Sequence, residues 1–244
     1  MERIIERTDD GSATLFVPEL NEHYHSTKGA RTESQHIFID MGLKASPAAT
    51  PRVLEIGFGT GLNAWLTLEE AERSRRNIHY TGLDLYPLDW QTVEQLGYIS
   101  SDEQLTIHRK QTTINEQFTP NEEEQQSAIE LFKQLHTSPW EKDVQLTPHF
   151  TLRKIETDVN KWRVENSPFN LVYFDAFAPE KQPEMWSQEL FNRLYVLLDR
   201  DGILTTYCAK GVVRRMLQTA GFTVERLPGP PGGKREILRA RKQE

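Results

Sequence analysis

From Arg52 onward, apolar and polar residues follow a repeating order of strand-like and helix-like segments. The apolar run Arg52–Gly57 predicts a strand, and the pattern from Leu62 to about Arg75 predicts a helix directly after it. Strands that alternate with helices are typical of a parallel sheet, so we predict an α/β fold with a mostly parallel sheet. The further strands expected in this sheet are Ile78–Leu85, Phe150–Glu156, Leu171–Phe177 and Ile203–Cys208.

The segments between and after these strands have helix signals and one hairpin signal. Pro87 can begin a helix, because proline is tolerated in the first turn, and this helix is expected to run to about Gly97. The remaining expected elements are helices near Met185–Leu198 and Gly211–Ala220, and an antiparallel pair of strands at Phe222–Leu227 and Glu236–Arg241.

Two stretches depart from this repeating order. Residues 10–40 alternate loosely between polar and apolar, which predicts an N-terminal β extension over 1–46 with short strands at Ala13–Val17 and around His36–Asp40. Residues 101–149 are polar and irregular apart from an amphipathic helix near Ser127–Leu135, so we expect a small inserted lobe there. A length of 244 residues suits one domain, and we predict a single domain over 1–244.

Three glycines at alternate positions, Gly57, Gly59 and Gly61, follow the first predicted strand. Glycine tolerates positive φ and lets a ligand approach the bare backbone, and amides at a helix start can hold a polar or anionic group. The Gly-x-Gly-x-Gly spacing differs from the Gly-x-Gly-x-x-Gly of dinucleotide sites, so it favours another nucleotide cofactor over an ordinary turn. The candidate cofactor-binding residues here are Glu55, Gly57, Phe58, Gly59, Thr60, Gly61 and Asn63.

Acidic residues follow three of the other predicted strands. In a doubly wound sheet, ligands bind outside the carboxyl ends of the strands, where the strand order reverses. Asp84 closes the second strand and can accept both hydroxyls of a ribose. Asp158 follows the third strand, where an adenine amino group would lie, although a helix cap is an equal alternative. Asp175 closes the fourth strand among apolar residues, where a carboxylate is costly unless a cation pairs with it.

Composition and charge narrow the class of protein. The net charge of −7 argues mildly against a nucleic-acid partner, but nine basic and three acidic residues lie between Lys210 and the C-terminus. That stretch is either a solvated surface or a face that holds a polyanion. The charged N-terminus and the lack of a long apolar run predict a cytoplasmic protein without a membrane segment. One cysteine, Cys208, and only two neighbouring histidines, His23 and His25, predict no metal site.

Taken together, these segments resemble one known family. The glycine loop opened by an acidic residue resembles the S-adenosylmethionine loop of class I methyltransferases, which have a Rossmann-like sheet. The whole chain resembles the methyltransferase part of the bifunctional bacterial MnmC enzymes, which mature the wobble uridine of certain tRNAs. The segments that carry this resemblance are Tyr24–Ser26, Glu33–Ser34, Ile37–Ile39, Gly57–Asn63, Asp175–Trp186, Thr205–Tyr207, Gly211–Leu217, Ala220–Phe222 and Gly233–Glu236.

The resemblance implies a reaction and roles for residues. Family members transfer a methyl group from S-adenosyl-L-methionine to the amine of 5-aminomethyl-(2-thio)uridine, giving 5-methylaminomethyl-(2-thio)uridine. The family's catalytic aspartate corresponds to Asp175, its ribose-binding acid to Asp84 and an acid of its adenine pocket to Asp158. The implied partner is the tRNA anticodon region. Phe177 and Tyr207 are candidates to contact the base, whereas Trp186 is expected to pack in the core. The candidate phosphate contacts are Lys210, Arg214, Arg215, Lys234 and Arg235.

The sequence departs from the family in two respects, and two other functions remain as alternatives. The bifunctional relatives carry a flavin-dependent oxidase after this domain, whereas this sequence stops at Glu244, so no flavin chemistry is expected. The precursor amine would come from elsewhere, and a separate oxidase acting upstream is one candidate source. The turn at 228–233 is more proline-rich than the family form. The alternative functions are an aminopropyltransferase like spermidine synthase, which the basic C-terminal stretch disfavours, and a non-catalytic tRNA-binding module.

Overall fold

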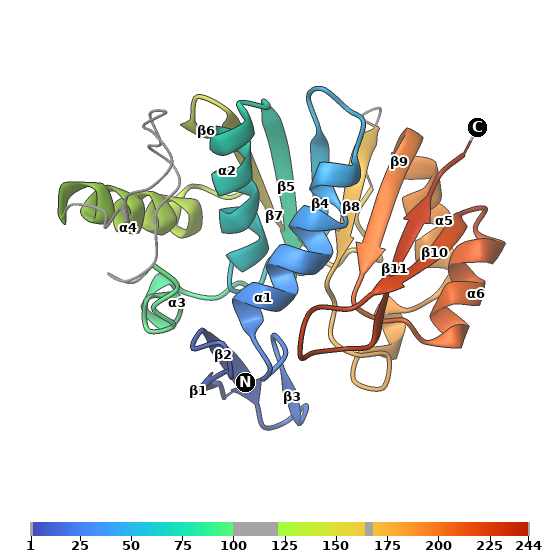
Figure 1. Cartoon of the computed structure of the whole chain (residues 1–244), viewed down its shortest axis with the longest axis horizontal. Helices are drawn as coiled ribbons and strands as arrows, with labels where there is room; N and C mark the ends of the chain where they lie inside the picture. Colours follow the sequence, from blue (N-terminus) through green and yellow to red (C-terminus); the bar gives the residue numbers. More distant parts are fainter. Residues whose placement is uncertain (1, 100–121, 164–167, 244) are drawn as a thin grey trace.

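An eight-stranded sheet forms the centre of the computed structural model, which describes residues 2–99, 122–163 and 168–243 (Figure 1). Its strand order is β10-β11-β9-β8-β4-β5-β7-β6. The strands are β4 (Arg52–Ile56), β5 (Ile78–Asp84), β6 (Asp143–Thr147), β7 (Phe150–Glu156), β8 (Phe169–Phe174), β9 (Leu198–Thr206), β10 (Thr223–Pro228) and β11 (Glu236–Arg241).

The five inner strands of this sheet are parallel. The chain moves from β4 outward through β5 to β7, then crosses to the other side of β4 and continues through β8 to β9. The edges are antiparallel, with β6 on β7 and the β10–β11 pair on β9. The predicted mostly parallel α/β sheet is confirmed, and its strand order reverses between β4 and β8, where a ligand crevice is expected.

Helices cover both faces of the sheet because successive side chains of a strand point to opposite faces. Val53 belongs to the apolar cluster that includes α2 (Leu62–Ser74) and α4 (Glu122–Thr137). The next residue, Leu54, belongs to the other cluster, with α5 (Gln188–Leu197) and α6 (Gly211–Thr219). A core on each face explains why the inner strands have nearly continuous apolar runs.

The N-terminal segment is only partly the expected β extension. A separate antiparallel sheet forms from β1 (Ile4–Arg7), β2 (Ala13–Val17) and β3 (Glu22–His23). The strand predicted around His36–Asp40 is wrong, because this stretch continues α1 (Ala30–Ser34) as a π-helix, η1 (Gln35–Asp40). Its apolar residues Ile37, Phe38 and Ile39 are all buried, and a short apolar run does not distinguish a strand from a buried helical segment.

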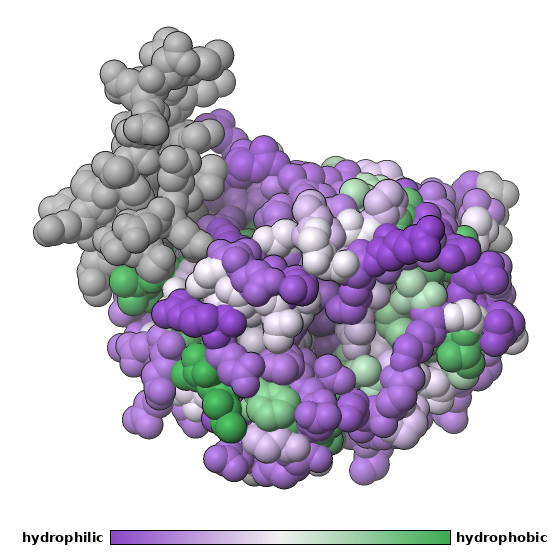
Figure 2. Space-filling model, turned by 60° about the horizontal axis from the view of Figure 1, so that its bottom comes forward, coloured by the Kyte–Doolittle hydropathy of each residue, from purple (hydrophilic) through white to green (hydrophobic). Residues whose placement is uncertain are grey.

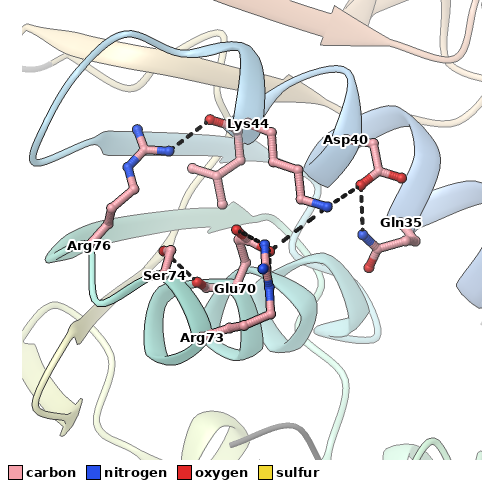
Figure 3. A network of polar contacts seen from close by, with 8 residues as sticks. Gln35, Asp40, Lys44, Glu70, Arg73, Ser74 and Arg76 are labelled. Atoms are coloured by element: carbon pink, nitrogen blue, oxygen red, sulfur yellow. Dashed lines mark hydrogen bonds and ion pairs between the residues drawn. The ribbon is translucent and has the colours of Figure 1, made fainter. Parts of the chain in front are cut away.

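Polar contacts tie this helical segment to α2 at the end of the sheet opposite the glycine turn (Figure 3). Lys44, in the short helix η2 (Leu43–Ala45), contacts Asp40 at 2.7 Å and Glu70 of α2 at 4.0 Å. Arg76 donates to backbone carbonyls of the same segment, among them that of Leu43 at 3.2 Å. Residues 30–45 are thereby fixed along α2, and the chain before them crosses to the other end of the sheet.

Other boundaries also differ from the prediction, and β9 begins at Leu198, five residues before the expected Ile203. The irregular stretch 101–149 contains β6, an edge strand whose half-exposed, polar sequence hides the strand pattern, and its part 101–121 lies outside the described residues. Strand β8 ends at Phe174, three residues early, so Asp175 begins the loop. Helix α3 (Trp90–Glu94) starts after Pro87, because the Asp89 side chain caps it by accepting from the Thr92 amide at 2.7 Å. Among the described helices, none combines the length and apolar character needed to cross a membrane.

Candidate active site

A cavity of about 880 Å³ lies at the carboxyl ends of β4, β5, β7 and β8. Figure 2 shows this end of the molecule, hollowed near its centre and bordered mainly by hydrophilic residues. The cavity is lined by the glycine turn and by Asp84, Asp158 and Asp175. The N-terminal segment contributes as well, through residues 22–27 and Glu33. The cavity therefore lies where the strand order predicts a ligand site.

The glycine turn has a backbone that only glycine adopts easily. Gly57, Gly59 and Gly61 have φ angles of 91°, 49° and 71°. A Cβ atom on Gly57 would lie 2.7 Å from the backbone oxygen of Asp175. The amides of Gly57 and Phe58 both donate to the carbonyl of Leu83 at 3.0 Å, which joins the turn to β5. The first glycine is therefore needed both for its φ angle and for close packing against the end of β8.

Asp84 binds the turn to the end of β5. Its Oδ2 accepts from the Gly59 amide at 2.7 Å, and its Oδ1 accepts from the Tyr86 amide at 2.8 Å. Burial raises the pKa of this carboxyl group, and these backbone donors partly oppose the rise. Because a carboxylate has about four lone-pair sites, it can still accept from a ribose while it holds both amides.

Asp175 lines the cavity, and its side chain accepts a hydrogen bond from one side-chain amide. Its Oδ2 accepts from Asn63 Nδ2 at 2.8 Å. Burial raises the pKa of Asp175 from 3.8 to about 7, although the Asn63 hydrogen bond and the Lys234 charge lower it in part. A carboxyl group that titrates near neutral pH is suited to holding an ammonium and taking its proton.

Two of the predicted cofactor-binding residues do not line the cavity. Glu55 is fully buried inside β4, where it accepts from Asn63 Nδ2 at 2.9 Å, and burial raises its pKa well above the usual value. Gly61 faces α4, and His136 Nε2 lies 2.6 Å from where its Cβ would be. Gly57, Phe58, Gly59, Thr60 and Asn63 do line the cavity.

Asp158 lines the cavity and also stabilises its own turn. Its Oδ1 accepts from the Asn160 amide at 2.9 Å, and its backbone carbonyl accepts from the amides of Lys161 and Trp162. The residues directly after Asp158 form a hydrogen-bonded turn and not a helix, so the helix-cap alternative is wrong, and the ligand contact stays a prediction.

Aromatic rings from three distant segments line the cavity beside Asp175. They are Tyr24, Phe177 and Tyr207, and the Tyr24 and Phe177 rings meet edge to face with centroids 5.1 Å apart. Tyr207 donates its hydroxyl to the Ala176 carbonyl at 2.9 Å, which fixes the ring at the end of β8. Trp186 packs in the core as expected, with only 5% of its surface exposed and Nε1 donating to the Phe177 carbonyl.

The predicted phosphate-binding residues separate into two groups. Lys210 and Lys234 line the cavity, whereas Arg214, Arg215 and Arg235 are not part of its wall. Lys210 forms an ion pair with Glu180.

Lys234 forms an ion pair with the buried Glu33 and lies 4.4 Å from the ring centroid of Tyr207. It therefore bridges the turn before β11 and the N-terminal segment.

Sequence reasoning missed two residues of the N-terminal segment that help to build the site, Tyr24 and Glu33. No motif marks them, and the only available signal was the family resemblance over Tyr24–Ser26 and Glu33–Ser34. His23 contacts Glu6 at 2.9 Å, and the described residues hold no group of three or more His, Cys, Asp or Glu placed to bind a metal ion.

This sequence is similar to a methyltransferase family and to relatives named for the biosynthesis of a tRNA nucleoside. A family model described as S-adenosyl-L-methionine-dependent methyltransferase matches residues 121–243. The "tRNA 5-methylaminomethyl-2-thiouridine biosynthesis bifunctional protein MnmC" of Cupriavidus metallidurans is 29% identical over 99% of this chain and 35% of its own length. Its counterpart in Magnetococcus marinus is 29% identical over 93% of this chain and 32% of its own.

A solved structure shares the fold. The crystal structure of MnmC2 from Aquifex aeolicus has a TM-score of 0.71, with 24% identity over 98% of this chain and 70% of that one. The chain spans about a third of the length of the bifunctional relatives it matches. Neither an aminopropyltransferase nor a non-catalytic module is favoured by these matches. Because the family model covers half of the sequence and the sheet carries its cavity at the expected switch point, the chain belongs to the S-adenosyl-L-methionine-dependent methyltransferase family.

Proposed function

We propose that this methyltransferase acts on the wobble uridine of tRNA. It would convert the primary amine of 5-aminomethyl-(2-thio)uridine to 5-methylaminomethyl-(2-thio)uridine. The observation that carries the proposal is the position of Asp175, a carboxyl group with a pKa of about 7 beside the glycine turn and three aromatic rings. The names of the relatives, which refer to this nucleoside, support the same substrate.

The residues of the cavity fit S-adenosyl-L-methionine. Gly57 and Gly59 line the cavity with bare backbone, Asp84 can accept the ribose hydroxyls, and Asp158, in the same cavity, would contact the adenine. When bound, the cofactor supplies an electrophilic methyl group, which the lone pair of the amine nitrogen attacks in line while sulfur keeps the electrons of the broken bond.

Asp175 would prepare the amine for this attack. An alkyl amine like that of lysine has a pKa of about 10.4, so it arrives mostly protonated and without a lone pair. The Asp175 carboxylate would hold the ammonium, orient it and accept its proton. Alignment of the reacting atoms then contributes roughly 7–11 kcal/mol of the barrier reduction, so the residue acts chiefly by placing the nitrogen.

The aromatic rings would receive the base. A uridine must leave the anticodon stack to reach the cavity, and unstacked bases are held by aromatic side chains. Phe177 and Tyr207 would contact the base, and Tyr24 adds a third ring from the N-terminal segment.

The direct test is methyl transfer to tRNA that lacks this modification step. Incubation with labelled S-adenosyl-L-methionine, followed by nucleoside mass analysis, should give 5-methylaminomethyl-(2-thio)uridine. A parallel incubation with decarboxylated cofactor and putrescine tests the aminopropyltransferase alternative. Transfer to putrescine, or no transfer to tRNA by a folded protein that binds the cofactor, would contradict the proposal.

Binding of tRNA should weaken as salt rises, because lysines at the cavity would displace counterions from phosphates. Two phosphate contacts would lower the affinity about tenfold between 50 and 200 mM salt, and Lys210→Ala should reduce the slope of log K against log salt by about one. The exposed Lys210–Glu180 pair is weak enough to exchange for a phosphate. Filter binding measures this slope.

The matched control is Lys44→Ala, because Lys44 contacts Asp40 and Glu70 (Figure 3) and does not line the cavity. Its slope should equal that of the unchanged protein. An equal slope for Lys210→Ala would remove Lys210 from the tRNA contact.

A further inference from the structure

A buried chain of polar groups runs from the cavity into the sheet beneath Asp175. Asn63 Nδ2 donates one hydrogen to Asp175 Oδ2 at 2.8 Å and the other to Glu55 Oε1 at 2.9 Å. The three side chains come from different elements, since Glu55 belongs to β4, Asn63 to the first turn of α2 and Asp175 to the loop after β8. These hydrogen bonds therefore link the two sides of the point between β4 and β8 where the strand order reverses.

Both supporting groups are held rigidly by burial. Glu55 has no exposed surface and Asn63 only 3%, so neither can exchange its partner for bulk water. The amide orientation is dictated by its neighbours, because the reverse orientation would point the Asn63 oxygen at the Asp175 carboxylate. With both Nδ2 hydrogens in use, the position of Asp175 depends on that of Asn63, which in turn depends on Glu55.

We propose that Asn63 and Glu55 are positioning residues for Asp175, in which Glu55 fixes the Asn63 amide and Asn63 holds the carboxylate toward the incoming amine. This inference depends on the proposed function only for the identity of the amine. It reassigns two residues that the sequence predicts to bind the cofactor, and one of them, Glu55, lies outside the cavity wall.

The charges around Asp175 make this hydrogen bond important for its protonation. Burial raises the pKa of Asp175 and the Glu33 charge raises it further, whereas Asn63 and Lys234 lower it. The half-buried Tyr207 also lies near the carboxylate, and the buried Tyr80 and Glu55 lie beneath it. Burial raises the pKa of Glu55 well above its usual value, which favours the neutral form, and this form can accept from Asn63 without adding a second negative charge.

The main test replaces the donor by a side chain of similar size. Asn63→Leu removes a hydrogen bond to a charged group, so the pKa of Asp175 should rise by about one to two units. The ratio of variant to unchanged turnover should then be lowest below pH 7 and rise toward pH 9, and this ratio cancels the titration of the substrate amine. The affinity for S-adenosyl-L-methionine, measured by calorimetry, should change little.

A second readout is independent of turnover. The carboxyl carbon of Asp175, labelled with ¹³C and assigned by its loss in Asp175→Asn, should titrate near neutral pH and shift upward in Asn63→Leu. If this shift occurs while tRNA is not methylated, the positioning role holds and the proposed substrate is wrong. If Asn63→Leu does not fold, Asn63→Ser keeps a smaller polar side chain that cannot bond both acids, and it should shift the same resonance.

Glu55 offers a matched pair of substitutions. Glu55→Gln keeps a neutral oxygen for Asn63 and should preserve most of the activity that Glu55→Leu loses. An unchanged Asp175 titration in the folded Asn63 variants, or a loss of cofactor affinity with an unchanged pH profile, would overturn the proposal. A loss in Glu55→Gln as large as in Glu55→Leu would show that the carboxyl group has another role.

Discussion

Asp175→Asn is expected to lower methyl transfer by about 10²–10⁴-fold, the usual effect of removing a general base, while the cofactor affinity stays within about threefold. The reason is that Asp175 faces the incoming amine, whereas the glycine turn and Asp84 would hold the cofactor. Single-turnover rates with tRNA and calorimetric titration with S-adenosyl-L-methionine measure the two effects separately. An equal loss of affinity and rate would instead make Asp175 a residue that shapes the cavity.

The same substitution should stabilise the protein as pH rises. The folded pKa of Asp175 is about 7, above the unfolded value near 3.8, so the unfolded state loses the proton first. The unchanged protein therefore loses stability between about pH 4 and 7, and Asp175→Asn avoids this loss, a gain of about 1–4 kcal/mol at pH 8. Chemical unfolding at pH 4 and pH 8 measures the difference. A variant that is inactive but more stable at pH 8 cannot owe its inactivity to misfolding.

Gly57→Ala is expected to disrupt both cofactor binding and stability. The new Cβ would lie 2.7 Å from the Asp175 carbonyl oxygen, and the residue has a φ angle of 91°. Strain of the backbone and displacement of Asp175 should together lower the free energy of unfolding by about 2–4 kcal/mol, with a loss of affinity of about tenfold or more. Chemical unfolding and cofactor titration measure both.

Gly11→Ala is the matched control for this prediction. Gly11 has a similar φ angle of 85°, but no described atom lies within 4 Å of the position its Cβ would take. It should therefore show the backbone strain alone, about 1–2 kcal/mol, with cofactor binding unchanged. If the two variants are equally stable and bind equally well, contact between Gly57 and Asp175 does not shape the site.

Local signals were enough to predict seven of the eight strands of the central sheet and several residues of the cavity wall. Side-chain periodicity marks β4, β5, β7 and α2 because each buries one face or both in a regular way. The glycine turn is equally local, since positive φ is a property of single residues. Acids such as Asp84 and Asp175 could be assigned to one end of the sheet because parallel strands share the direction of their carboxyl ends.

The sequence by itself therefore determined the fold class, the glycine turn and the acid beside it. Only the tertiary structure decided which side chains meet. Glu55 is next to the turn in sequence but points into the core, because alternate residues of β4 face opposite covered sides of the sheet. Lys234 reaches Glu33 across 201 positions, and Tyr24 reaches Phe177, since folding places the N-terminal segment beside the strand ends. Such contacts follow from packing between distant segments, which no local pattern encodes.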